Sequence, residues 1–165
     1  MSGTKINAAI VGASGYSGEE LVRLLLGHPH VNLSVLTSRQ HAGQGITSVF
    51  PRFAGHAEAN DLTFSEPSID LLADKAQAVF LALPHGVAAE FAVLLTKRGL
   101  TVIDLSADFR LNDVDTYSEF YGTKHPAPEW LPKAVYGLPE IRRDAIAGAH
   151  THRFARLLPD EYFAA

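Results

Sequence analysis

The chain has 165 residues, about the size of one domain, and 47% of them are hydrophobic against 19% charged, a composition that excludes a disordered or collagen-like chain. Fourteen Lys and Arg against 18 Asp and Glu give a net charge of −4, and both signs are spread along the chain, which argues against a basic face for nucleic acid or an anionic membrane. The absence of cysteine removes disulfides, thiolate metal sites and a cysteine nucleophile from these residues. We expect a cytoplasmic protein, because no signal-peptide core and no apolar stretch of about 18 residues is visible.

Strand and helix patterns alternate from the start of the chain. Residues 5–11 form a nearly uninterrupted apolar run, typical of a strand buried in a parallel sheet, and a glycine turn follows at 12–17. Leucines at helical spacing predict a helix from Gly18 to a stop at Gly27, and alternation over 31–37 predicts the strand that closes a βαβ unit. Glycines and small polar residues predict a loop excursion over 39–59.

The rhythm then repeats as a short strand, a short helix or turn, a strand, a helix and a strand, at residues 62–64, 69–76, 78–83, 87–97 and 100–105. This alternation predicts an α/β fold, Rossmann-like, with a doubly wound and mainly parallel sheet. Beyond Ser106 the periodicity falls away and no regular element is predicted.

A glycine-rich loop, Gly12-Ala-Ser-Gly-Tyr-Ser-Gly18, lies between the first predicted strand and helix, which is the context a dinucleotide-binding loop requires. Gly12 permits the tight turn, Gly15 lets backbone N–H groups approach a pyrophosphate, and Gly18 allows close packing of helix on strand. The hydroxyls of Ser14 and Ser17 are further donors. The alternative is a turn that only connects two elements.

Thr37-Ser38-Arg39 ends the second predicted strand, where an NAD-binding domain usually carries a carboxylate for the ribose 2′-OH. A hydroxyl and a guanidinium instead suit a 2′-phosphate, so we expect NADP rather than NAD. The alternative is that Arg39 is only a solvated loop charge.

Two further groups lie at the carboxyl ends of predicted strands, where open α/β sheets bind ligands: Pro84-His85-Gly86 and Asp104-Leu-Ser106. His85 is either a proton carrier or a structural turn residue. Arg110 either holds an anionic substrate group or pairs with a nearby aspartate, Asp108 or Asp113. The other histidines lack metal-ligand spacing, so we predict no metal, and no nucleophile-elbow pattern supports a serine triad.

Several motifs, in the same order and spacing, resemble those of one family through about residue 149. These motifs are the glycine loop, Glu20-Leu-Val-Arg, His28-Pro-His-Val, Thr37-Ser-Arg, Leu83-Pro-His-Gly, Asp104-Leu-Ser-Ala-Asp-Phe-Arg-Leu, Tyr121-Gly and Ala134-Val-Tyr-Gly-Leu-Pro-Glu140. They resemble N-acetyl-gamma-glutamyl-phosphate reductase, the NADPH-dependent enzyme of arginine biosynthesis. The Ser-Ala-Asp-Phe-Arg-Leu and Tyr-Gly-Leu-Pro-Glu motifs are the most specific, since aspartate-semialdehyde dehydrogenases share the glycine loop and the fold.

The resemblance implies a cofactor domain over 1–149, followed in the family by an α+β domain that binds substrate and forms a homo-oligomer. It also implies that a cysteine thiolate attacks the acyl phosphate and that NADPH reduces the thioester to the semialdehyde. By the same resemblance the cofactor contacts are Gly12, Ser14, Gly15, Tyr16, Ser17, Gly18, Ser38, Arg39, Pro84 and Ser106, and Arg110 lies near the substrate phosphate.

Residues 150–165 depart from the family, which has Pro-Gly-Cys-Tyr-Pro-Thr shortly after Tyr-Gly-Leu-Pro-Glu. Codons that encode Phe154 to Asp160 can be read one base later as Ser-Pro-Gly-Cys-Tyr-Pro, so our hypothesis is an out-of-frame tail on a chain that stops before the substrate domain. The alternative is a genuine terminal helix, Phe154 to Phe163, in a short paralogue.

This chain alone is therefore expected to have little or no turnover, because it has no thiol for the thioester. Two other functions remain open: a non-catalytic NADP-binding module, and a fragment similar to aspartate-semialdehyde dehydrogenase.

Overall fold

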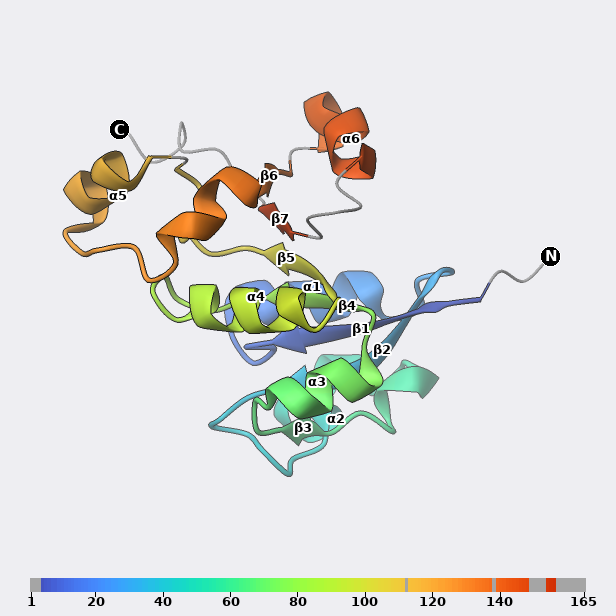
Figure 1. The fold of residues 1–165 in the computed structure, drawn as a ribbon. Coiled ribbons are helices and arrows are strands. Elements are labelled where there is room, and N and C mark those ends of the chain that lie inside the picture. Colours follow the sequence, from blue (N-terminus) through green and yellow to red (C-terminus); the bar gives the residue numbers. More distant parts are fainter. Residues whose placement is uncertain (1–3, 112, 138, 149–153, 157–165) are drawn as a thin grey trace. The chain divides into compact units, whose positions relative to one another are not determined.

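The structure, a computed structural model, describes residues 4–111, 113–137, 139–148 and 154–156 (Figure 1). The chain divides into two compact units, Met1–Ala82 and Leu83–Ala165. The first unit contains β1 (Ile6–Val11), α1 (Tyr16–Leu25), β2 (Val31–Thr37), α2 (Ile46–Val49), the short 3₁₀ helices η1 (Pro51–Phe53) and η2 (Ala57–Ala59), β3 (Phe64–Ser65), α3 (Ile69–Lys75) and β4 (Ala78–Leu81). The second contains α4 (Ala88–Lys97), β5 (Thr101–Asp104), α5 (Val114–Tyr121), the 3₁₀ helix η3 (Pro128–Lys133), β6 (Val135–Tyr136), α6 (Pro139–Gly148) and β7 (Phe154–Arg156).

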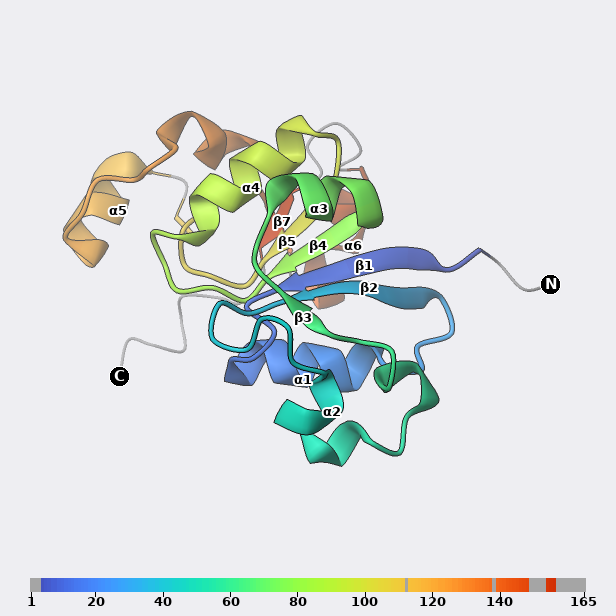
Figure 2. The same ribbon diagram turned by 90° about the horizontal axis from the view of Figure 1, so that it is seen from below.

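The first unit has a parallel sheet in the order β3-β2-β1-β4, which is the order of the first part of a Rossmann sheet. Figure 2 shows α1 on one face of β1 and β2 and α3 on the other. Right-handed crossovers explain this arrangement, because the chain moves outward from β1 to β2 and back from β3 to β4. The doubly wound α/β fold predicted from the sequence is confirmed.

The core of the first unit lies between α1, the sheet and the segment that follows β2. Val22 and Leu26 of the α1 region are buried with Ile10 of β1, and Ile46 and Phe53 from the excursion complete the cluster. The excursion, predicted as loop, thus contains α2 and two 3₁₀ helices. Its apolar residues recur three or four positions apart and bury one side, a pattern hidden by the surrounding glycines.

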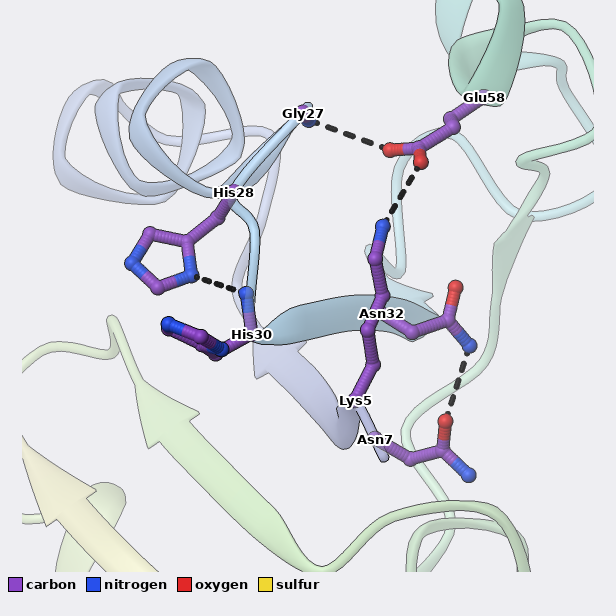
Figure 3. Close-up of polar contacts among 7 residues, drawn as sticks. All are labelled: Lys5, Asn7, Gly27, His28, His30, Asn32 and Glu58. Atoms are coloured by element: carbon purple, nitrogen blue, oxygen red, sulfur yellow. Dashed lines mark hydrogen bonds and ion pairs between the residues drawn. The ribbon is translucent and has the colours of Figure 1, made fainter. Parts of the chain in front are cut away.

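Polar contacts fix the end of this sheet at which strands β1 and β2 begin (Figure 3). Glu58 of η2 accepts bonds from Lys5 Nζ at 3.1 Å and from the backbone N–H of Gly27 at 3.1 Å, and Asn32 Nδ2 donates to Asn7 Oδ1 at 2.9 Å. These contacts tie the excursion to the start of β1 and the end of α1, at the sheet edge opposite the loops that follow the strands.

The second unit has parallel strands in the order β5-β7-β6, and α4 packs on β5. The expectation of irregular chain beyond Ser106 is wrong, because α5 and α6 lie there. Local signals explain α5: the Asp113 side chain accepts the Thr116 N–H at 2.8 Å, and Gly122 ends the helix in the left-handed conformation at φ 66°.

The carboxyl-terminal residues are described only at 154–156, which form strand β7. The alternative of a terminal helix over Phe154 to Phe163 is therefore wrong for these three residues, and 157–163 lie outside the described residues. The domain division at residue 149 and the out-of-frame origin of the tail stay proposals. Within the described ranges no helix is long and apolar enough to cross a membrane, and the cytoplasmic location stays a prediction.

Candidate functional site

The glycine loop follows β1 and leads directly into α1. Gly12 has a φ of 84°, a conformation that side-chain-bearing residues rarely adopt, so this turn requires glycine. A Cβ on Gly18 would meet the backbone of Gly12 and lie 2.6 Å from Ala13 Cα. The sequence predicts that Gly18 allows the helix to pack on the strand, and the structure shows that glycine is required there by contact of the helix with the loop backbone of Gly12 and Ala13.

Gly15 differs from its two neighbours in the motif because the described structure gives it no steric reason to be glycine. Its φ of −81° and ψ of 167° are ordinary extended values. A Cβ there would find only Gly12 O within 4 Å, at 3.6 Å, which is a normal contact. The missing side chain leaves open space beside the start of α1, and that is the space a phosphate needs to reach the backbone.

The N-terminus of α1 is open in the same way. Gly15 is its N-cap, and no side chain of a described residue caps it. The first N–H groups of a helix have no partner within the helix, and with the helix dipole they attract an anion. Tyr16 and Ser17 begin the helix with exposed side chains, and Tyr16 is 96% exposed. The arrangement fits a pyrophosphate.

A small hydroxyl cluster joins the glycine loop to the end of β2. Ser14 Oγ lies 2.7 Å from Ser38 Oγ, and Ser38 Oγ also accepts the His41 N–H at 3.2 Å. The Ala13 N–H donates to Thr37 O at 2.9 Å. Ser14 and Ser38, separated by 24 positions and both expected from the sequence to contact the cofactor, are thus brought together.

Two buried polar atoms flank this cluster without a hydrogen-bond partner among the described residues, Thr37 Oγ1 and His41 Nδ1. Such atoms cost about 1–3 kcal/mol each and are uncommon in native structures. Arg39 is exposed and has no ion-pair partner in the described part of the chain. No carboxylate of the described residues therefore neutralises its guanidinium.

In the second unit, the carboxyl end of β5 continues into a chain of side-chain turns. Asp104 accepts the Ser106 N–H at 2.9 Å and the Ser106 hydroxyl at 2.8 Å, and Ser106 Oγ accepts the Asp108 N–H at 3.1 Å. The Asp-x-Ser-x-Asp spacing is typical of such turns, in which short polar side chains bond to backbone two residues on. All three residues are buried.

The carboxyl group of Asp104 is completely buried at the end of β5. Burial raises its pKa to about 6, while the bonds from Ser106 act in the opposite direction. The nearby Asp108 charge also raises the pKa, and Arg110 lowers it. Asp104 is thus a carboxyl whose ionisation is made costly by its surroundings.

Asp108 extends this network to the start of α4. Its carboxylate accepts the Gly86 N–H at 2.6 Å and the Ala89 N–H at 2.9 Å. The His125 ring accepts the Ala127 N–H on Nδ1 at 2.9 Å, so the proton lies on Nε2, which donates to Asp108 O at 2.6 Å. The sequence analysis does not assign Asp108 or His125 to this hydrogen-bond network.

The other predicted residues of the second unit lie around this network. Pro84, His85 and Gly86 are exposed, and the His85 ring lies 5.8 Å from the Tyr121 ring, tilted by 32°. Arg110 is half-buried and its Nε donates to Ser106 O at 3.2 Å. The Asp108 carboxylate, one of the two aspartates that the sequence offers as partners for Arg110, accepts the N–H groups of Gly86 and Ala89.

Comparisons with known proteins agree with this architecture. The chain is 51% identical over 146 residues to N-acetyl-gamma-glutamyl-phosphate reductase of Akkermansia muciniphila, covering 88% of this chain and 42% of that protein. It is 48% identical over 145 residues to the LysW-linked 2-aminoadipate/glutamate phosphate reductase of Saccharolobus solfataricus, covering 88% and 40%. The chain spans about two-fifths of the length of these relatives, and the resemblance inferred from the motifs is confirmed.

A solved structure with the same fold is aspartate semialdehyde dehydrogenase II of Vibrio cholerae, with a TM-score of 0.66 at 18% identity over 93% of this chain and 38% of that chain. Residues 7–149 match the family described as semialdehyde dehydrogenase, NAD binding domain, and residues 150–165 lie outside the match. By this match the chain belongs to the semialdehyde dehydrogenase family and contains its NAD-binding domain.

Proposed function

We propose that the first unit binds NADP(H), with the pyrophosphate at the N-terminus of α1. The observation that carries the proposal is Gly15, where neither the backbone conformation nor any atom of the described residues requires glycine. A ligand that approaches the backbone at this point supplies the missing reason. Gly12, Ser14, Tyr16, Ser17 and Gly18 are the other proposed contacts of the loop.

Selection of NADP over NAD is assigned to Ser38 and Arg39. The Ser38 hydroxyl is held by Ser14 and His41, and the exposed Arg39 guanidinium has no described carboxylate to neutralise it. A 2′-phosphate would bring two negative charges to this place, and guanidinium–phosphate bonds are among the stronger hydrogen bonds in proteins. The residue that would bind the ribose of NAD, a carboxylate at the end of β2, is replaced by these two.

Titration of the full chain with NADPH and NADH tests this assignment. We expect NADPH to bind more tightly, and Arg39→Gln to weaken NADPH binding by about tenfold or more while leaving NADH binding nearly unchanged. Arg23→Gln is the matched control, because Arg23 is an exposed arginine near the end of α1, paired with Glu20. Equal affinities for the two nucleotides in the unaltered chain would contradict the proposal.

The family reaction proposed for the protein is reduction of a phosphorylated side-chain carboxyl to the semialdehyde, as with N-acetyl-glutamyl 5-phosphate. When bound, the reduced nicotinamide supplies the hydride. Pro84 and Ser106 are proposed to lie around the cofactor and Arg110 near the substrate phosphate, on the strength of the resemblance. A homo-oligomer and an arginine-pathway role are proposed on the same basis.

The LysW-linked reductase is a second candidate, because its similarity to this chain is nearly the same, 48% against 51%. Both candidates share the phosphorylated carboxyl of a glutamate-like side chain. The chain contains no cysteine, so no thioester step can be derived from its residues, and we propose that NADPH oxidation with either acyl phosphate is slow or absent for this chain alone.

A further inference from the structure

The start of α4 is filled by a side chain from far along the sequence. The N-cap residue Val87 provides no side-chain cap, yet the Ala89 N–H of the first turn donates to Asp108 Oδ2 at 2.9 Å. The other carboxylate oxygen accepts the Gly86 N–H at 2.6 Å. Asp108 therefore lies where an external anion would bind at a helix N-terminus.

The backbone of Asp108 is held as firmly as its carboxylate. Its N–H donates to Ser106 Oγ at 3.1 Å, and its carbonyl accepts from His125 Nε2 at 2.6 Å. Tyr117 Oη lies 3.4 Å from Oδ1, which is at the long limit of a hydrogen bond. Asp108 is buried to 0% exposure, so the carboxylate has exchanged its water for these donors.

Through Gly86 this network reaches the turn before α4. Gly86 has a φ of 81°, so the direction of its N–H is set by a backbone conformation that glycine alone adopts readily. The next residue back, His85, lies against Tyr121 of α5, and Tyr121 in turn lies 4.7 Å from Tyr117. The turn is thus held by a backbone bond on one side and by a ring contact on the other.

We propose that Asp108 is a positioning residue that fixes the Pro84-His85-Gly86 turn by supplying its own carboxylate to the N-terminus of α4. The turn is then kept in one conformation without a bound ligand, and the N-terminus of α4 is closed to other anions. The consequence for cofactor binding rests on the proposed function, because Pro84 is a proposed cofactor contact.

The experiment uses the full chain labelled with ¹⁵N and compares Asp108→Asn with Asp113→Asn. Asp113 is the control because its carboxylate also caps a helix of the second unit, α5, through Thr116. We expect Asp108→Asn to move the Gly86 and Ala89 amide protons upfield and to speed their exchange with solvent, since a charge-assisted bond becomes a neutral one. Asp113→Asn is expected to leave both amides unchanged, and unchanged amides in Asp108→Asn overturn the proposal.

A second measurement separates positioning from general support of the fold. Asp108→Ala removes the carboxylate, and formate has the size and charge to replace it, so added formate is expected to return the Gly86 and Ala89 amides toward their original shifts. Chloride at equal ionic strength is expected to have no such effect. Equal effects of the two salts contradict an anion site at α4, and if Asp108→Ala does not fold, the Asp108→Asn amides decide alone.

NADPH titration tests the link to the cofactor separately. We expect Asp108→Asn to weaken NADPH binding by about fivefold, the equivalent of one lost hydrogen bond in positioning. If Asp108→Asn shifts the Gly86 and Ala89 amides but leaves the NADPH affinity unchanged, the link between Asp108 and cofactor binding is overturned. If the unaltered chain does not bind NADPH, the proposed function fails, whereas the amide shifts still decide the role of Asp108.

Discussion

The two units each contain a positive-φ glycine turn followed by a ten-residue helix, at Gly12 before α1 and at Gly86 before α4, but the two helix N-termini differ in what fills them. The N-terminus of α1 has no side-chain cap among the described residues and has open space at Gly15. At the N-terminus of α4, the N–H groups of Gly86 and Ala89 donate to the buried carboxylate of Asp108. The positive end of the helix dipole is thus left without a side-chain anion from the described residues in the first unit, where we propose a ligand, and is occupied by a carboxylate in the second.

The largest expected effect comes from closing the space at Gly18. Gly18→Ala would bring a Cβ to 2.6 Å from Ala13 Cα and onto the Gly12 backbone, so α1 must move away from the loop. We expect a loss of about 3 kcal/mol or more in the free energy of unfolding of the first unit, measured by urea denaturation with circular dichroism.

Gly15→Ala is the matched control for that substitution. Its Cβ would lie 3.6 Å from Gly12 O, and an N-cap alanine costs about 0.5–2 kcal/mol relative to the best caps. We expect a small change in stability together with clearly weaker NADPH binding. A Gly15→Ala chain that binds NADPH as well as the unaltered chain would contradict the assignment of the open space to the pyrophosphate.

These glycines also mark what could be predicted from the sequence. The βαβ unit, the glycine loop and the meeting of Ser14 with Ser38 follow from local periodicity and from the rule that parallel strands end at one edge of the sheet. The motif alone does not distinguish Gly15, for which we propose contact with a ligand, from Gly18, where a backbone contact requires glycine. Distinguishing the roles of these two glycines requires the three-dimensional structure.

The second unit was harder to predict because its site depends on contacts between distant residues. The bonds from Gly86 and Ala89 to Asp108 span 22 and 19 positions, and no periodic pattern signals them. The sequence pattern does not predict helix α5, although Asp113 and Gly122 are ordinary start and stop signals, because mostly polar and aromatic residues fill 113–121 without the leucine spacing that marks α1. The Asp-x-Ser-x-Asp spacing was visible and indicates a turn, but it does not indicate what the last carboxylate binds.

The second unit is expected to become less stable as the pH rises, because the carboxyl group of Asp104, next to the turn that holds Asp108, is buried. Burial raises the pKa of Asp104 to about 6 in the folded chain, against 3.8 for an aspartate in water, so between these values the folded state keeps a proton that the unfolded state releases. The contribution of Asp104 to the free energy of unfolding is fully present below about pH 4 and is lost as the pH rises from about 4 to 6. The total loss is roughly 2–3 kcal/mol.

Asp104→Asn is the test of that dependence, because an amide can still accept the Ser106 N–H without ionising. Subtracting its unfolding free energy from that of the unaltered chain at each pH removes the contributions of other groups. We expect a difference that changes between about pH 4 and 6 and is constant above. A difference independent of pH would contradict the pKa shift of Asp104.

Ser17→Asp tests the comparison directly by giving α1 a carboxylate of its own. Ser17 is exposed in the first turn, where an acidic side chain stabilises a helix by about 0.3–1 kcal/mol. The same charge opposes a pyrophosphate, so we expect NADPH affinity to fall about tenfold or more while the melting temperature stays equal or rises. Ser17→Asn, which has the same shape without the charge, is the control and is expected to retain most of the affinity.

Tyr117→Phe tests the weakest contact of the filled N-terminus. The bond from Tyr117 Oη to Asp108 Oδ1 is 3.4 Å long, against 2.6 and 2.9 Å for the two backbone donors. Because long hydrogen bonds contribute little, we expect a loss of about 0.5 kcal/mol in unfolding free energy and unchanged Gly86 and Ala89 amides. Tyr117→Leu, which also removes ring contacts at 4.7 Å with Tyr121 and His125, is expected to cost several times more. If Tyr117→Phe shifted the two amides as much as Asp108→Asn does, the backbone bonds would not be what holds the carboxylate, and the phenol would be the residue that places it.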